Sequence, residues 1–199
     1  MFISANNILC LIVLILLVSC DILKKNGVCE TTEHVEFRNL QFTFPLSGRK
    51  VSEIASGKIE YIQGWIKTDS LIGSETIYWY FDSHDTNEPL YNTDNYMHTA
   101  AIYGVSMLLY NEEHKTEKDI IRELKLTYPG EYIQKEHYGK SYWIYDKGCL
   151  KILIQKLPYY LNQNSSTVVI LPVISFCYGL TDGQIKNYVN SLGKLADTE

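Results

Sequence analysis

The first nineteen residues of this 199-residue chain contain no charged side chain, so all 41 charged residues lie in the remaining 180. Those 18 basic and 23 acidic residues give a formal charge of −5, with no excess of basic side chains. A dedicated nucleic-acid-binding domain carries a basic face, so the composition argues against nucleic acid as a partner. With 46% hydrophobic residues, the chain is also too apolar for an intrinsically disordered protein.

The local signatures of common catalytic and metal sites are missing from the sequence as well. It has no CxxC pair for a thioredoxin-like or zinc-ribbon site, no HExxH motif and no GxSxG nucleophile elbow. These absences favour a protein that is not an enzyme and predict no cofactor. A catalytic triad assembled from distant positions would leave no such motif, so an enzyme stays open as the alternative.

The uncharged N-terminal segment is strongly apolar. Fifteen of its nineteen residues are hydrophobic, and Ile8 to Val18 form an unbroken apolar run of eleven. A bilayer span needs about 20 apolar residues, so the run is short for a transmembrane helix. Its length is typical of the hydrophobic region of a signal peptide. The run ends in the tetrapeptide Leu17-Val18-Ser19-Cys20.

This tetrapeptide resembles the lipobox of bacterial lipoproteins: an aliphatic residue, a small or β-branched one, a small one, then cysteine. The resemblance implies cleavage after Ser19 and a diacylglyceryl group on the Cys20 thiol, with acyl chains such as palmitate. It therefore implies a lipid-anchored protein of the cell envelope that faces the periplasm or the exterior. The alternative is an uncleaved anchor, for which Lys24 and Lys25 would favour a cytoplasmic body.

Export would bring three further cysteines, Cys29, Cys149 and Cys177, into a compartment that is oxidising in many bacteria. Three thiols allow at most one intramolecular disulfide. Cys149 and Cys177 fall on strand-like segments and are the candidate pair, whereas Cys29 lies in the tether that follows the signal peptide. The alternative is three buried or inert thiols.

Residues 1–19 form the expected signal peptide. The rest of the chain divides into a tether over 20–34 and a single globular domain over 35–199. Apolar periodicity and cap residues predict a series of elements in that domain. In chain order they are a strand at 35–44, a short helix at 50–56, a strand at 76–81, a strand (or a helix) at 99–110, a helix at 116–127, a hairpin of 141–145 with 149–157, a strand at 167–177, and a helix that begins with the capping box Thr181 to Gln184.

Strands joined by hairpins, with few crossover helices, predict an α+β fold. We expect one mostly antiparallel sheet of about five or six strands, with two main helices packed on one face. Pro172 lies inside the most apolar strand and predicts a bulge or a local bend there.

A polar segment after the strand at 76–81 offers a candidate metal site. Four metal-competent side chains occur there within seven residues: Asp82, His84, Asp85 and Glu88. Oxygen-rich loops suit calcium, and a histidine with carboxylates suits zinc. The spacing matches no established ligand pattern, so a solvated polar loop is the alternative. An envelope hydrolase or metal-dependent binding protein built on this loop is one hypothesis for function.

Sixteen tyrosines and three tryptophans suggest a different site. Alternate residues of a strand point to opposite sides, so if Trp79 and Trp143 face inward, Tyr78, Tyr80 and Tyr142 face outward. Such a row would suit a protein partner, because aromatic residues are enriched in interfaces. The alternative is that helices cover this face. The first hypothesis is therefore a non-catalytic, lipid-tethered interaction domain, in one version an immunity-type protein whose acidity suits a basic partner.

Overall fold

The computed structural model describes residues 29–38, 40–54, 59–62, 65–69, 76–81, 101–110, 112–160 and 168–196. The chain divides into two compact units, Met1–Glu30 and Thr31–Glu199, and the described helices and strands all lie in the second unit. Within the described ranges, none of the helices combines the length and the apolar character that crossing a bilayer requires.

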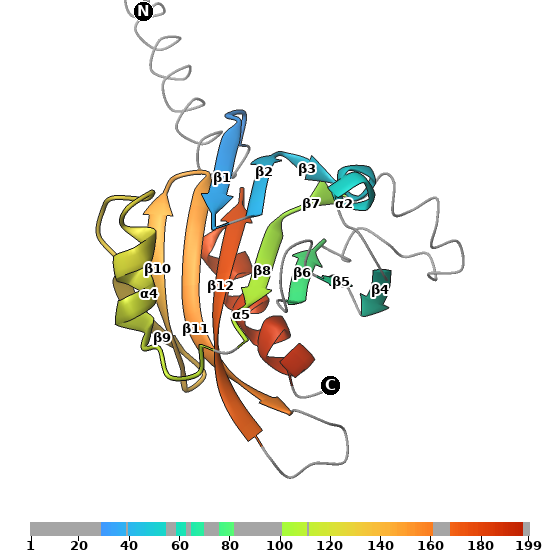
Figure 1. Ribbon diagram of the computed structural model, residues 1–199. Coiled ribbons are helices and arrows are strands. Elements are labelled where there is room, and N and C mark those ends of the chain that lie inside the picture. The colour runs from blue at the N-terminus through green and yellow to red at the C-terminus, as the bar shows by residue number, and fades with distance from the viewer. Residues whose placement is uncertain are drawn as a thin grey trace, which may run out of the picture. The chain divides into compact units, whose positions relative to one another are not determined.

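An eight-stranded sheet forms the body of the second unit (Figure 1). Neighbouring strands all run antiparallel, which confirms the prediction of a mostly antiparallel sheet. From edge to edge the strands are β4 (Ile59–Ile62), β5 (Trp65–Asp69), β6 (Thr76–Tyr80), β8 (Gly104–Leu108), β12 (Val168–Tyr178), β11 (Leu150–Tyr160), β10 (Lys140–Lys147) and β9 (Ile133–His137). The sheet exceeds the predicted five or six strands because β4, β5 and β9 lack a clear apolar alternation.

The segment predicted as one strand over 35–44 is a hairpin. Its arms are β1 (Glu33–Phe37) and β2 (Leu40–Phe44), and Arg38 takes a positive φ of 54° in the turn. The sequence did not predict this turn because buried and exposed residues alternate on both arms, as they would in one continuous strand. A second small sheet pairs β3 (Leu46–Ser47) with β7 (Ala101–Ile102), and α2 (Gly48–Ile54) follows β3.

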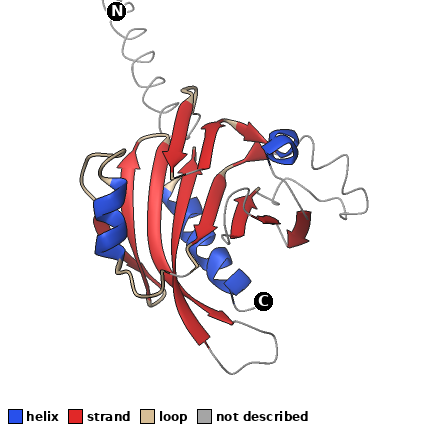
Figure 2. Cartoon of the chain, in the orientation of Figure 1, coloured by secondary structure: helices blue, strands red, loops and turns tan. Residues whose placement is uncertain are grey.

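The two main helices, α4 (Glu117–Leu124) and α5 (Asp182–Ala196), lie on opposite faces of the sheet, not on the same face as predicted. Tyr188 of α5 bonds Ser106 Oγ, which in turn bonds Ser175 Oγ of β12. Tyr128, just after α4, packs its ring 6.0 Å from Phe176. Ser175 and Phe176 are consecutive strand residues, so they point to opposite faces. Figure 2 shows α4 in front of the sheet and α5 behind it.

Both helices begin where the sequence predicts. Thr116 caps α4 through a capping box with Asp119. At the start of α5, Gln184 N donates to Thr181 Oγ1 and Thr181 N donates to Gln184 Oε1, at 3.3 and 2.9 Å. These reciprocal bonds satisfy backbone donors that a helix start otherwise leaves open. The apolar stripe of α5 then packs on the sheet: Ile185, Tyr188, Val189 and Leu192 are all buried.

Pro172 does not produce the expected bulge. The pairing of β11 with β12 keeps one register from Leu150↔Tyr178 to Tyr160↔Val168, with Pro172 opposite Lys156. Leu109 N donates to Pro172 O at 3.0 Å, and Leu109 is the first residue after the end of β8. The backbone nitrogen of Pro172, which carries no hydrogen, faces the same side as this carbonyl. The proline therefore lies where the β8 ladder has ended, and it interrupts no pairing.

Candidate functional site

The cysteines do not form the predicted pair. Cys177 is free and fully buried, whereas Cys29 and Cys149 are each disulfide-bonded. Cys177 belongs to the apolar core beneath α5, and burial raises the pKa of its thiol. Cys149 instead lies in the turn between β10 and β11, outside that core. Cys29 is the penultimate residue of the first unit, which ends at Glu30.

The predicted tyrosine surface is wrong as well. Tyr78 and Tyr142 are only 2% and 3% exposed, and both belong to the core that α5 covers. Tyr80 is partly buried, with its ring 5.0 Å from that of Tyr188. The alternative holds instead: a helix covers this face, and the tyrosines fill the space between helix and sheet.

Two predicted sites lie outside the described residues: the lipobox Leu17 to Cys20, and the loop with Asp82, His84, Asp85 and Glu88. In the described part of the chain, histidine, cysteine and acidic side chains do not gather in groups of three or more that could hold a metal ion. The metal site on the loop therefore stays a prediction.

Hydroxyl groups gather in the core beneath α5. Ser106 Oγ lies 2.6 Å from both Ser175 Oγ and Tyr188 Oη, and all three residues are fully buried. Burial raises the pKa of Tyr188 and keeps its hydroxyl neutral. The hydroxyls satisfy one another and are closed to solvent. This hydroxyl cluster (Ser106, Ser175 and Tyr188) therefore joins β8, β12 and α5 and is no catalytic site.

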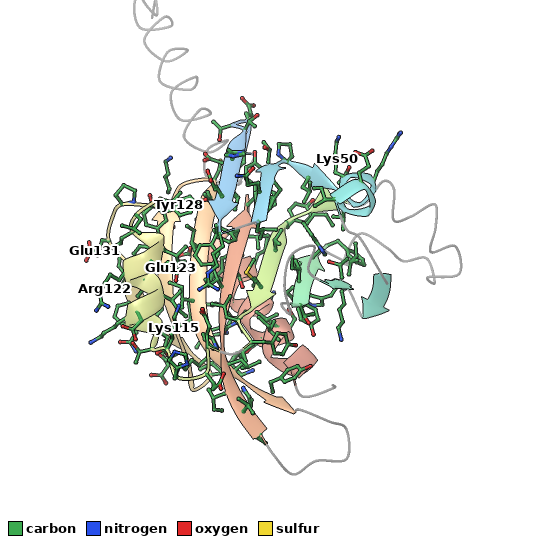
Figure 3. All side chains as sticks on the ribbon, in the orientation of Figure 1. Lys50, Lys115, Arg122, Glu123, Tyr128 and Glu131 are labelled. Atoms are coloured by element: carbon green, nitrogen blue, oxygen red, sulfur yellow. The ribbon has the colours of Figure 1, made fainter. Side chains whose placement is uncertain are left out.

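The other face of the sheet carries an ion-paired cluster. Arg38, in the β1–β2 turn, bonds Glu112 and Glu123 at 2.8 Å each, and Lys115 also pairs with Glu112. Figure 3 labels Lys115, Glu123 and Tyr128 on the α4 side of the sheet. The hydrogen bond from Arg38 lowers the pKa of Glu123. These pairs hold the β1–β2 hairpin against α4, so we assign the cluster a structural role.

The candidate site is an opening in the sheet between β10 and β11. Their ladder runs from Lys147↔Leu150 to Tyr142↔Gln155 and ends there. Beyond that point β10 stays paired with β9 to Lys140, while β11 continues with β12 to Tyr160. The opening between the diverging strands, which we call the fork cleft, has a volume of about 340 Å³. Its lining residues are Glu117, Gly139, Lys140, Ser141, Gln155, Lys156, Leu157, Pro158 and Gly193.

Gln155 lies where the fork cleft begins. It is 1% exposed, and its side-chain Nε2 is buried without a hydrogen-bond partner. Leu153 and Leu157, two positions away along β11, are both part of the apolar core. A buried amide donor without a partner costs about 1–3 kcal/mol. A polar side chain kept at this cost beside an opening is a candidate for ligand recognition.

Charged and hydroxyl residues line the same cleft as this amide. Within the described residues, neither Lys140 nor Lys156 has an ion-pair partner. A Cβ at Gly193 of α5 would collide with Lys140 Nζ, so glycine leaves the space that this ammonium occupies. Ser141 Oγ accepts a hydrogen bond from Gln134 at 2.7 Å, which leaves the hydroxyl hydrogen free to donate. Glu117 brings the only carboxylate among the described lining residues.

Comparison with protein-family models, with curated proteins and with solved structures finds no match. The sequence analysis missed the fork cleft, although one signal for it was present. Gln155 interrupts the apolar face of β11, but so does Lys151, whose Nζ bonds Asp146 at 3.0 Å. Only the structure separates a satisfied polar residue on this face from an unsatisfied one.

Proposed function

We propose that this protein is a lipid-anchored lipoprotein of the bacterial cell envelope that acts as a non-catalytic binding domain. Binding takes place in the fork cleft, and the observation that carries this part is the buried, unpartnered amide of Gln155. The cleft volume of about 340 Å³ lies within the range of small-molecule sites.

The lining of the fork cleft supports binding rather than catalysis. Nucleophilic catalysis needs a nucleophile beside a base that activates it. Neither histidine nor cysteine occurs among the described lining residues, and Ser141 Oγ contacts an amide of Gln134 instead of a base.

The disulfide-bonded state of Cys29 and Cys149 supports a place outside the cytoplasm. Structural disulfides form and persist in oxidising compartments, whereas cytosolic thiols are kept reduced. The lipobox Leu17 to Cys20 supports the same location. From Cys20 to Thr31, where the second unit begins, the chain spans eleven residues and reaches at most about 40 Å. The domain would therefore stay close to the membrane that holds its lipid.

The fork cleft lies at the end of the second unit away from the point where the chain enters it. Tyr178 Oη donates to Thr31 O, and Tyr178 pairs with Leu150 at the start of β11. The cleft is reached five residues further along β11, at Gln155. At about 3.3 Å per strand residue, the two ends are about 17 Å apart. This arrangement leaves the cleft open to solutes, or to a protein partner that presents a matching group.

The anchor is tested by treating producing cells with globomycin, which blocks the lipoprotein signal peptidase. We expect an unprocessed precursor to accumulate, and we expect C20A to lose both processing and acylation. Normal processing in the presence of globomycin would contradict the lipoprotein proposal.

The binding function is tested separately, by thermal-shift screening of the purified protein against small envelope solutes such as sugars, amino acids, nucleotides and short peptides. We expect saturable stabilisation by at least one solute, lost in the near-isosteric variant Gln155→Met. Lys147→Met is the control, since this exposed residue lies at the opposite end of β10. A screen without such a solute would contradict a binding role for the fork cleft.

A further inference from the structure

The polar groups of the fork cleft are chiefly donors. Gln155 Nε2 carries two hydrogens and has no partner, and the ammonium groups of Lys140 and Lys156 are donors only. The hydroxyl of Ser141 already accepts a bond from Gln134, which leaves it a hydrogen to give. Such a site is complementary to a group that accepts several hydrogen bonds and carries negative charge.

The backbone of Lys156 adds one donor and one acceptor. The backbone carbonyl of Pro172 points toward β8, away from β11. Lys156 is the residue directly opposite Pro172 on β11. In an antiparallel pair, two opposite residues either both point their backbone groups at each other or both point them away, so the backbone groups of Lys156 point away from β12. That direction is toward β10, on the side where the ladder between β10 and β11 has ended. The backbone of Lys156 therefore points toward the fork cleft.

We infer that the fork cleft binds a small organic carboxylate, an inference that rests on the proposed binding function. The carboxylate accepts from Gln155 Nε2, and its charge is balanced by Lys140, whose ammonium lies beside α5 on the same face of the sheet. Its carbon skeleton lies against Leu157 and Pro158, which supply the apolar part of the lining.

The charge of the lining favours a carboxylate over a phosphate. Two lysines and one glutamate give the cleft a net charge of +1, which matches a monoanion. A phosphate close to its dianionic form would add repulsion from Glu117 and leave one charge uncompensated. The volume of about 340 Å³ also exceeds what a bare carboxylate group fills, so the ligand carries a carbon skeleton.

The test is isothermal titration of the full mature protein in detergent with three probes: butyrate, 4-methylpentanoate and inorganic phosphate. Wild-type protein should bind at least one of the two carboxylates saturably and more tightly than phosphate. Gln155→Met and Lys140→Met should each weaken this binding at least tenfold. Lys147→Met removes the same charge from the far end of β10 and should leave it within twofold.

Every other result of these titrations overturns either the carboxylate site, the ligand class or the binding function itself. Tighter binding of phosphate, or equal weakening by Lys147→Met and Lys140→Met, would overturn the carboxylate site. A second outcome is that neither carboxylate binds, but the wider screen finds a solute of another class whose binding is lost in Gln155→Met. This outcome would overturn the ligand class and would leave the binding function standing. Failure of every solute would overturn both. Circular dichroism of each variant shows that it is folded, so that lost binding is not mistaken for lost structure.

Discussion

The hydroxyl cluster and the side chain of Gln155 at the fork cleft both lie on the face of the sheet that α5 covers, and they differ in whether their hydrogen bonds are complete. In the hydroxyl cluster, Ser106 Oγ bonds Ser175 Oγ and Tyr188 Oη at 2.6 Å each, and all three residues are fully buried. At the fork cleft, Gln155 is equally buried but its Nε2 has no partner. A complete network stabilises and specifies one packing, whereas an incomplete one costs free energy. The first region therefore has a structural role, and the second is available for a ligand.

A glycine serves each region in a different way. A Cβ at Gly104 would lie 2.5 Å from Cε2 of Tyr188, so glycine lets the ring pack directly on β8. At Gly193 the atom in the way is instead the charged end of Lys140. The first glycine thus admits an apolar ring into the core. The second lies beside the flexible end of Lys140, which could move if a Cβ were added.

The largest effect is expected from removing the centre of the hydroxyl cluster. Tyr188→Ala deletes a fully buried ring that packs against Trp65 and Tyr80. Large-to-small core changes of this kind cost about 3–5 kcal/mol, and the two serines also lose a partner. Urea unfolding followed by tryptophan fluorescence measures the loss. Lys186→Ala, at an exposed position of the same helix, should change stability by less than about 0.5 kcal/mol. A similar small loss for Tyr188→Ala would mean that α5 does not cover this face.

The acid sensitivity of the fold should come from the opposite face. Arg38 lowers the pKa of Glu123, so the unfolded chain binds protons more readily than the folded one. This contribution is complete above the unfolded pKa of about 4.3 and is lost as the pH falls through the lowered folded value. Arg38→Ala should therefore cost about 1–2 kcal/mol at pH 7 and progressively less below about pH 4. Urea midpoints measured between pH 3 and pH 7 test this expectation. A cost independent of pH would show that Arg38 acts through packing alone.

A smaller effect is expected when only the hydroxyl of Tyr188 is removed. Tyr188→Phe keeps the ring but deletes the bond to Ser106, while Ser106 and Ser175 still bond each other. We expect a loss of about 1 kcal/mol, the usual net worth of a buried hydrogen bond. The urea midpoint measures it at unchanged slope. Unchanged or greater stability would remove the contrast with Gln155, because the hydroxyl cluster would then also be incomplete.

Sequence reasoning succeeded where structure is local. The helix start at Thr116, the capping box at Thr181 and the hairpin turn at Gly148, with its φ of 70°, depend on neighbours a few residues away. It failed where two distant segments decide the outcome. The inward packing of Tyr78 and Tyr142 depends on which face α5 covers. The partner of a buried polar residue is also a distant one, so Lys151 and Gln155 look alike in the sequence.

The smallest change in stability is expected at Gln155, and its sign is opposite to that of the Tyr188 variants. Methionine has nearly the shape of glutamine but no amide to desolvate, so Gln155→Met should stabilise the fold by up to about 1 kcal/mol. Gln41→Met, at an exposed position of β2, controls for the general effect of the replacement. Paired urea titrations of the two variants resolve a difference of this size.

This gain should accompany the loss of ligand binding in the same variant. A residue that lowers stability when the cleft is empty, and whose replacement abolishes binding, is retained for binding. If Gln155→Met instead destabilised the protein by about 1 kcal/mol or more, the amide would have a partner in solution. Gln155 would then belong with the hydroxyl cluster, and the difference between the two regions would disappear.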